Sequence, residues 1–253
     1  MLFCRFLVFL IVLLLAWPVS AITNIESIAT SANQEGVEAR IDLSVLYRRG
    51  NTNYSHYAGG LRLMDFNLQR QRILILDREY ADTDGDKSTD RFFTHLRHVW
   101  LTGQTLDYEA FIQYQTNDFT FLQHRSLIGG GIKLTVIPDT TFHSLNIGMG
   151  GYYTEERYKN DTLGEQGSYW RGNFYATYRI LSLGNSALMN TVYIQPRLNK
   201  PGDIYALNDF RLESFINRHL SLFVSITHDY KSHPFADNKR VDGHWRLGLS
   251  LRF

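Results

Sequence analysis

Thiols are almost absent from this chain of 253 residues, because Cys4 is its single cysteine. Cys4 falls in an N-terminal segment that we expect to be removed, which leaves no thiol for a disulfide, a metal ligand or a nucleophile. Charge of one sign is not in excess either, with 26 Lys and Arg against 25 Asp and Glu. No nucleic-acid partner is therefore predicted.

The N-terminal segment has the features of an export signal. A single positive charge precedes an apolar run from Phe6 to Trp17, and the small residues Val19 and Ala21 follow at the spacing of a cleavage site. We expect a signal peptide over residues 1–21 and a polar lead-in over residues 22–35. An uncleaved anchor is the alternative, although the apolar run is shorter than the roughly 20 residues of a spanning helix.

Long hydrophobic runs are missing from the rest of the chain, where no stretch approaches the roughly 18 apolar residues of a transmembrane helix. The mean hydropathy of -0.24 also excludes a helical membrane bundle. Aromatic residues nevertheless make up 14% of the chain, more than a soluble core of this size needs. Low hydropathy with many aromatics is typical of a membrane β-barrel, because only alternate residues of each strand face lipid.

Apolar and polar residues alternate strictly in several segments, which predicts β-strands and excludes amphipathic helices there. The alternation is clearest over residues 37–48 and 241–253. We predict about 12 strands of about ten residues each, the length of a tilted strand that crosses a membrane. The other strands that we single out cover residues 71–80, 92–101, 106–115, 170–180, 188–195 and 220–227.

The segments between these strands fall into two length classes. The short ones lie near residues 66–70, 102–105, 137–140, 182–186 and 217–219. The longer ones are rich in Asp, Asn, Gly and Lys, and they lie at residues 81–90, 116–123, 155–168, 197–202 and 231–240. Short periplasmic turns and longer extracellular loops have this arrangement in outer-membrane barrels, and an even strand count places both chain ends in the periplasm.

The predicted fold is all-β, a closed antiparallel transmembrane β-barrel over residues 36–253 in the outer membrane of a Gram-negative bacterium. Closure is expected because open sheet edges in lipid would leave backbone groups without hydrogen-bond partners. The predicted partners are outer-membrane lipid and lipopolysaccharide. We expect a monomer and predict no cofactor.

Charged residues on the polar faces of the strands are expected to line the barrel interior. Those that we single out are Asp107, Glu109, Arg171, Arg179, Asp209, Arg211, Glu213, Asp242, His244 and Arg246. Both signs occur, and pairing across a narrow interior is the simplest interpretation because unpaired buried charges are costly. The alternatives are a polar channel with little ion preference and a ligand pocket between opposed charges.

An acidic segment is the sharpest local motif. Asp82, Asp84, Asp86 and Asp90 stand around Gly85, and hard cations such as calcium bind several carboxylate oxygens. The glycine comes too early for a helix-flanked calcium loop, and no Glu closes the segment. Two interpretations stay open, a weak cation site in a loop or an acidic turn in which Asp and Gly end a strand.

Short motifs at five places in the chain occur in a characteristic order. They are Leu46 to Thr52, the glycines 148, 150 and 151 followed by Tyr152, Gln195-Pro196, His228-Asp229-Tyr230 with Pro234, and Gly248 to Phe253. Together they resemble the family of salt-induced outer-membrane proteins, which is catalogued as a domain of unknown function. The resemblance covers nearly the whole chain after the signal. It implies an outer-membrane barrel associated by name with salt response, and it assigns no catalytic residue.

The final strand also resembles the signal by which the barrel-assembly machinery recognises its clients. Phe253 stands at its end, and Leu251 precedes Phe253 on the same face. The alternative is an ordinary closing strand that ends in Phe by chance. The assembly machinery is therefore a predicted partner.

Enzymatic function is the main alternative, because some outer-membrane barrels are lipases or deacylases. Histidines and serines are scattered, and no spacing that indicates a catalytic mechanism occurs. His228, or His143 beside Ser144, are the candidates. A soluble periplasmic barrel that binds a ligand inside is a third possibility, and its polar faces would point outward. We predict a non-enzymatic envelope protein, either a small pore or a stress-linked binding protein.

Overall fold

The computed structural model describes residues 35–50, 52–138, 142–159, 166–180, 183–234 and 239–253. The predicted signal peptide, and all but the last residue of the predicted lead-in, lie outside the described residues. Within these ranges no helix is long and apolar enough to cross a membrane.

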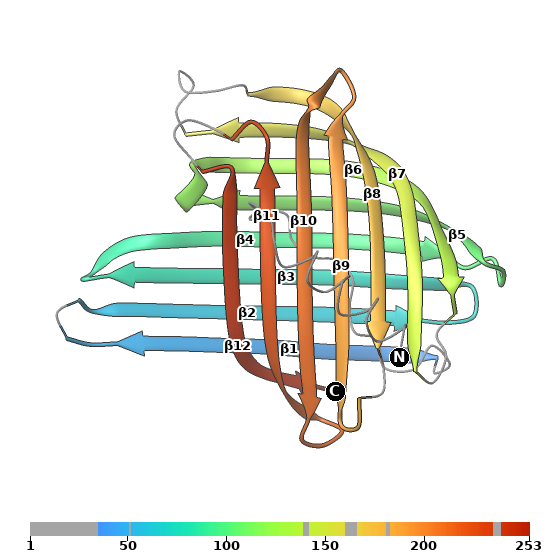
Figure 1. Ribbon diagram of the computed structural model, residues 1–253, viewed down its shortest axis with the longest axis horizontal. Helices are drawn as coiled ribbons and strands as arrows, with labels where there is room; N and C mark the ends of the chain where they lie inside the picture. The colour runs from blue at the N-terminus through green and yellow to red at the C-terminus, as the bar shows by residue number, and fades with distance from the viewer. Residues whose placement is uncertain (1–34, 51, 139–141, 160–165, 181–182, 235–238) are drawn as a thin grey trace, which may run out of the picture.

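Twelve antiparallel strands form a closed barrel, in which each strand pairs with its neighbours in sequence and the last strand pairs with the first (Figure 1). The predicted all-β barrel and its strand count are confirmed. A short 3-10 helix, η1 (Asp118–Thr120), follows the fifth strand. The strands are β1 (Gly36–Arg48), β2 (Tyr54–Phe66), β3 (Arg70–Thr83), β4 (Asp86–Trp100), β5 (Leu106–Asn117), β6 (Leu122–Ile137), β7 (His143–Tyr158), β8 (Gly167–Ile180), β9 (Ser186–Arg197), β10 (Lys200–Phe215), β11 (Leu220–Lys231) and β12 (Val241–Arg252).

The two ends of the barrel differ in how well the sequence predicted them. At the near end, where β1 begins and β12 finishes, the short connections lie where they were expected. At the far end, residues 81–90 continue β3 and β4 instead of forming the predicted loop, and only Asp84 and Gly85 connect the two strands. Both residues have a positive φ, 53° and 90°, as in the type I′ turns that match the twist of paired strands. The loop predicted at residues 197–202 is also wrong, because β9 ends at Arg197 and β10 begins at Lys200. Longer connections do separate β7 from β8 and β11 from β12.

Side chains alternate between the two faces of the wall, because successive residues of a strand point to opposite sides. On β12, for example, Trp245, Leu247 and Leu249 are exposed on the outside, while Ser250 is buried inside. Every strand contributes to this outer surface, which includes Leu43, Tyr57, Leu63, Leu96, Tyr108, Ile112, Ile128, Ile147, Trp170, Ile194, Leu212 and Leu222. Apolar surface of this extent indicates contact with lipid or with another protein.

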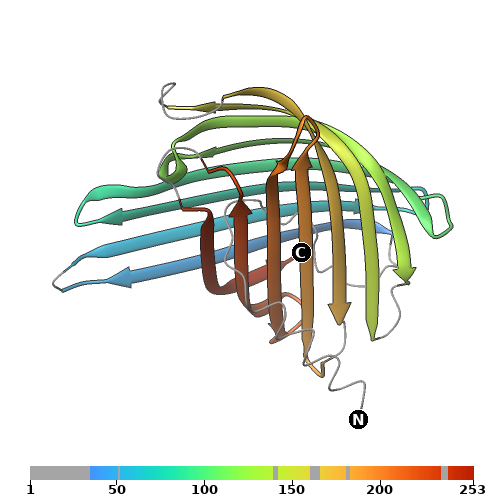
Figure 2. The same cartoon turned by 45° about the horizontal axis from the view of Figure 1, so that its top comes forward.

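The barrel is not a circular tube. Strands β9–β12 lie across strands β1–β4 at a steep angle, and β5–β8 curve between these two walls (Figures 1 and 2). Inward side chains from the two crossing walls are therefore close enough to pack against each other.

Candidate functional site in the barrel interior

The ten charged residues predicted to line the interior occupy inward-facing positions of their strands. Seven are buried, namely Asp107, Glu109, Arg171, Arg179, Asp209, Arg211 and Glu213. The other three, Asp242, His244 and Arg246, lie on β12 and are half-buried. Some of them have partners of opposite charge: Lys133 lies 3.5 Å from Asp107, and Arg97 forms an ion pair with Glu109.

An apolar cluster, which we call the plug, crosses the middle of the interior. Ile75 and Phe93 are among its most buried members, at 0% and 1% exposure. Because packed protein interiors leave few voids, the plug blocks this part of the interior. It joins Met64, Ile73, Ile75 and Phe93 of β2–β4 to Tyr175, Tyr193, Tyr205 and Leu207 of β8–β10.

Tyr175 fixes the polar edge of the plug. Its ring occupies the space above Gly148, where an added Cβ would lie only 1.9 Å from a ring carbon. Its hydroxyl donates to Glu109 at 2.9 Å and accepts from Arg97 at 2.6 Å. Since Arg97 and Glu109 also pair with each other, all three polar groups have partners although they are buried.

Glu156 is the centre of a buried ionic cluster at the far end of the barrel. Its carboxylate accepts hydrogen bonds from the hydroxyls of Tyr158 at 3.1 Å and Tyr205 at 3.0 Å. Arg125 lies 3.2 Å from the same carboxylate and 5.2 Å from the centre of the Tyr205 ring. A buried carboxylate held by hydrogen bonds and a guanidinium group is compensated for its loss of water.

Arg171 completes this cluster from β8. It donates to the Asp203 carboxylate at 2.8 Å and to the Gln195 carbonyl at 2.9 Å, and it lies 3.5 Å from the centre of the Tyr205 ring. Lys231 lies 4.9 Å from the same ring. We call the whole group the cation–tyrosine cluster; its members are Arg125, Glu156, Tyr158, Arg171, Asp203, Tyr205 and Lys231.

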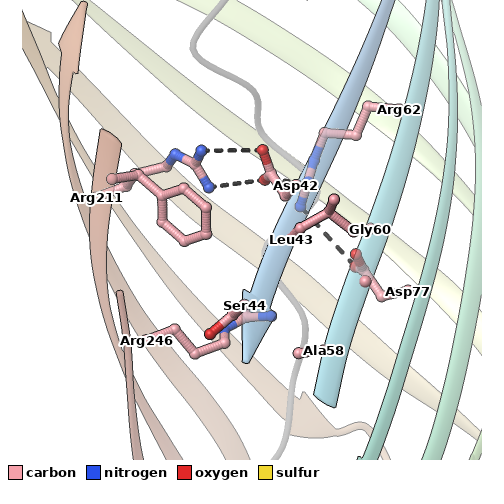
Figure 3. A pocket seen from close by; sticks show the side chains of 11 residues that line it. Asp42, Leu43, Ser44, Ala58, Gly60, Arg62, Asp77, Arg211 and Arg246 are labelled. Atoms are coloured by element: carbon pink, nitrogen blue, oxygen red, sulfur yellow. Dashed lines mark hydrogen bonds and ion pairs between the residues drawn. The ribbon is translucent and has the colours of Figure 1, made fainter. Parts of the chain in front are cut away.

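Asp42 on β1 is the centre of a second ionic network, nearer the middle of the barrel. Its carboxylate lies 3.0 Å from Arg62 and 2.9 Å from Arg211 (Figure 3). Arg40 lies 3.2 Å from the same carboxylate. Glu213 extends the network, because it pairs with Arg40 and accepts a 2.5 Å hydrogen bond from Ser221. Asp42 and Arg211 stand on strands that are separated in the barrel by β11 and β12, so this pair spans the interior.

The inner wall formed by β12, β1, β2 and β3, which we call the polar wall, is less tightly closed. The side chains of Arg62, Asp77 and Glu79 are 13%, 18% and 17% exposed. A cavity of about 10 Å³ lies in this wall, with Asp42, Ser44, Arg62, Asp77, Arg211 and Arg246 in its lining (Figure 3). This volume is room for about one water molecule.

The acidic segment is not gathered into a cation site. Asp84 accepts hydrogen bonds from the backbone and side chain of Asn53, at 2.7 and 3.2 Å. Asp90 pairs with Arg78 at 2.5 Å and with Lys87 at 3.5 Å. Asp82 and Asp86 stand on opposite strands of the hairpin. In the described part of the chain, no three His, Cys, Asp or Glu residues are placed to hold a metal ion, and the geometry fits the acidic-turn interpretation.

The candidate catalytic residues are not brought together. Ser144 is buried in the interior, while the neighbouring His143 points to the outer surface, as adjacent strand residues must. His228 also lies at an outward position, against Gly243. Ser232 and His233 do form a hydrogen bond, at 3.0 Å, but the Ser232 hydroxyl also donates to the Gly202 carbonyl at 2.8 Å.

The predicted assembly signal lies at the closure of the barrel. Phe253 exchanges two backbone hydrogen bonds with Ala39, of 3.1 and 2.8 Å. Leu251 is paired with Ile41 of β1 and with Leu220 of β11. The segment expected to carry the signal therefore also joins the last strand to the first.

Several inward charges were missed by the sequence-based selection. Arg40 and Asp42 stand on the polar face of the clearest alternating segment, and that pattern alone could have identified them. Arg125 and Glu156 were harder to find, because glycines and tyrosines share their inward faces and obscure the alternation. The missed residues also include Arg62, Asp77, Arg97, Asp203 and Lys231.

A family of known sequences covers most of the chain. Residues 41–253 match the family described as "Protein of unknown function, DUF481". The chain belongs to this family. The resemblance inferred from the motifs is confirmed, while the association of this DUF481 protein with salt stays a prediction. No curated protein matches the sequence.

Solved structures show related barrels. The structure of the NanC porin has a TM-score of 0.50 and 11% sequence identity, and the match covers 85% of this chain and 99% of that chain. The COG4313 outer membrane channel from Pseudomonas putida F1 has the same TM-score and identity, and that match covers 90% of this chain and 99% of the other. At these identities the comparison concerns the fold of this DUF481 protein alone.

Proposed function

We propose that this protein is a non-enzymatic barrel of the Gram-negative outer membrane that acts as a narrow channel for small polar solutes and is closed at rest. The observation that carries the proposal is the division between its two surfaces. The outside is apolar on every strand, whereas the inside holds charged groups beside the plug. This arrangement suits lipid outside and a polar interior, and it does not suit the soluble barrel considered as an alternative.

The position of the chain in the membrane follows from the strand order. With twelve strands, β1 begins and β12 ends at the near end, which we assign to the periplasm because an exported chain arrives there. The cation–tyrosine cluster would then face the outside of the cell. Lipid and lipopolysaccharide at the outer surface, and the assembly machinery at Phe253 and Leu251, are the partners that we propose.

The two similar structures support a channel, since one is named a porin and the other an outer membrane channel. The plug and the one-water cavity argue that the resting conductance is small. A lipase or deacylase finds less support, because the Ser232 hydroxyl is held by backbone groups and the other candidates point to opposite faces.

Planar-bilayer recording of two double variants tests the proposal. Ile75→Ala with Phe93→Ala removes two side chains of the plug, and we expect the single-channel conductance to rise several-fold over a small wild-type value. Leu76→Ala with Phe92→Ala is the matched control, because these adjacent residues point outward, and its conductance should equal that of the wild type.

Two results would contradict the proposal. One is release of the protein from isolated outer membranes by carbonate, with no change in gel mobility on boiling, which would exclude a membrane barrel. The other is an equal conductance for both double variants, which would mean that the plug does not close the pathway.

A further inference from the structure

The pairing of β1 with β12 is much shorter than the other pairings in the described barrel. Their ladder runs from Arg40↔Arg252 to Leu43↔Leu249, only four residue pairs. The β1–β2 ladder has thirteen pairs and the β11–β12 ladder eleven. Within the described residues, the far half of β1 therefore pairs with β2 alone, and the far half of β12 pairs with β11 alone.

Gly248 marks the point where the two strands part. A Cβ at this position would lie 2.4 Å from the Leu43 carbonyl oxygen and 2.7 Å from the Phe223 ring, so glycine is needed for β12 to pass there. Just beyond this point, the Ser44 hydroxyl donates to the Leu247 carbonyl at 2.9 Å. A side chain thus satisfies a backbone group where the ladder has ended.

The rim of the gap beyond Gly248 is apolar. Val45 on β1 is 69% exposed, and Trp245 and Leu247 on β12 are 76% and 68% exposed. Leu46 stands at an inward position and is still 57% exposed, unlike the buried inward residues of most strands. Such an apolar rim suits a hydrocarbon chain.

The floor of the gap is polar and carries charged residues of both signs. The one-water cavity lies there, between Ser44 of β1 and Arg246 of β12. The side chain of Arg246 forms no hydrogen bond or ion pair with any described residue. It is attracted from a distance by Glu79, but the Glu79 carboxylate is already bound by His56 at 2.9 Å. A free guanidinium group is well suited to a carboxylate or a phosphate.

Unpaired strand edges are costly in lipid, because no water is present to bind the free backbone groups. A gap in the barrel wall at membrane depth is therefore expected to be occupied by something that carries polar atoms. The apolar rim and the free cation beneath it define the chemistry of that occupant.

We propose that the far half of the β1–β12 seam is a lateral portal for an anionic amphiphile with one acyl chain. The chain stays in the lipid against Val45, Trp245 and Leu247, while a small anionic head group enters between the strands and binds Arg246. The inference rests on the proposed function only in requiring a membrane barrel, and it does not depend on the plug.

Binding of radiolabelled palmitate to the purified protein in a non-ionic detergent tests the head-group site. We expect saturable binding by the wild type, at least a tenfold loss of affinity for Arg246→Ala, and partial retention for Arg246→Lys. Arg157→Ala is the matched control, because Arg157 is an exposed arginine on β7 that pairs with Glu155, and it should bind like the wild type. The neutral monopalmitoylglycerol should compete poorly with palmitate.

Tethering the two strands tests the portal itself. In a Cys4→Ser background, Val45→Cys with Leu247→Cys places thiols where the next outward pair would stand if the ladder continued. A short cross-linker that a reductant can cleave should then abolish palmitate binding, and reduction should restore it. Leu43→Cys with Leu249→Cys is the control, because these residues are already paired, and the same tether should leave binding unchanged.

The portal is rejected if palmitate does not bind saturably, if Arg246→Ala binds like the wild type, or if the tether at positions 45 and 247 leaves binding intact. These failures differ from a failure of the proposed channel. A barrel that changes its gel mobility on boiling and conducts ions after plug substitution, but does not bind palmitate, would overturn the portal alone.

Discussion

The cation–tyrosine cluster and the polar wall contain the same kinds of charged residue on the inside of one barrel. They differ in how completely these charged side chains are shielded from water. In the cluster, Arg171 is 0% exposed, donates hydrogen bonds to Asp203 and packs against the Tyr205 ring. On the polar wall, Asp77 and Glu79 keep access to water, and Arg246 has no ion-pair partner among the described residues. Tyrosines account for the difference, because their rings fill the volume between charges in the cluster.

This comparison suggests a division of labour. The cluster stabilises the far end, where strands β6–β10 continue past the plug. The polar wall has spare charge and space for water, and it borders the short β1–β12 ladder. Stability is therefore expected to depend on one region and permeation or binding on the other.

Removal of a guanidinium group from each region should give the largest contrast in stability. We expect Arg171→Ala to lower the free energy of unfolding by about 3–5 kcal/mol, because it leaves the Asp203 carboxylate buried with a weaker partner. Arg246→Ala should cost about 0.5 kcal/mol, because this half-buried side chain has no ion-pair partner among the described residues that the substitution would leave buried. Urea unfolding in micelles measures both values. Equal losses of unfolding free energy would show that the two regions contribute equally to stability.

Glycine substitutions should sharpen the same comparison with a smaller effect. Gly148→Ala forces the Tyr175 ring away from its bonds with Glu109 and Arg97, and overpacking of this kind costs about 1–3 kcal/mol. Gly60 also faces inward, but the nearest atom to an added Cβ is the carboxylate end of Asp77, at 2.4 Å. That flexible side chain can move, so Gly60→Ala should cost about 0.5 kcal/mol. A larger loss for Gly60→Ala in urea titrations would mean that the polar wall is packed as tightly as the cluster.

The periodicity of the sequence predicts which side chains face inward, but it cannot predict which of them meet. The inward positions of Asp107, Glu109 and Arg211 follow from a period of two along each strand. The pairing of Arg40 with Glu213 does not, because 173 residues separate them and their proximity depends on how the barrel closes. The plug was missed for the same reason, since its members come from β2–β4 and β8–β10 and meet only where the walls cross.

The lengths of the loops were the second feature that could not be predicted from the sequence. Residues 81–90 carry polar side chains on both faces, so apolar alternation ends although the strands continue. The hydrogen-bonded ladder needs only the backbone, and the Asp84-Gly85 turn lets it run to the tip of the hairpin. The early end of the β1–β12 ladder could not be predicted from the alternation, which continues along β12 and is interrupted on β1 at Leu46.

The smallest effect on stability is expected for a substitution outside both regions, at η1 on the far end of the barrel. Hydrogen bonds from Lys87 at 2.5 Å and Lys159 at 2.9 Å hold the pKa of Asp118 below its ordinary value. Because the folded pKa is lowered, the stabilisation is complete above the unfolded pKa of about 4 and is lost as the pH falls through the folded value. Asp118→Asn should therefore be slightly less stable than the wild type at pH 7, and the two urea midpoints should converge below about pH 4. Salt at about 1 M should shrink the difference at pH 7, because exposed charges are then screened over about 3 Å. A difference that persists at low pH would show that Asp118 acts through packing or capping of η1 and not through its charge.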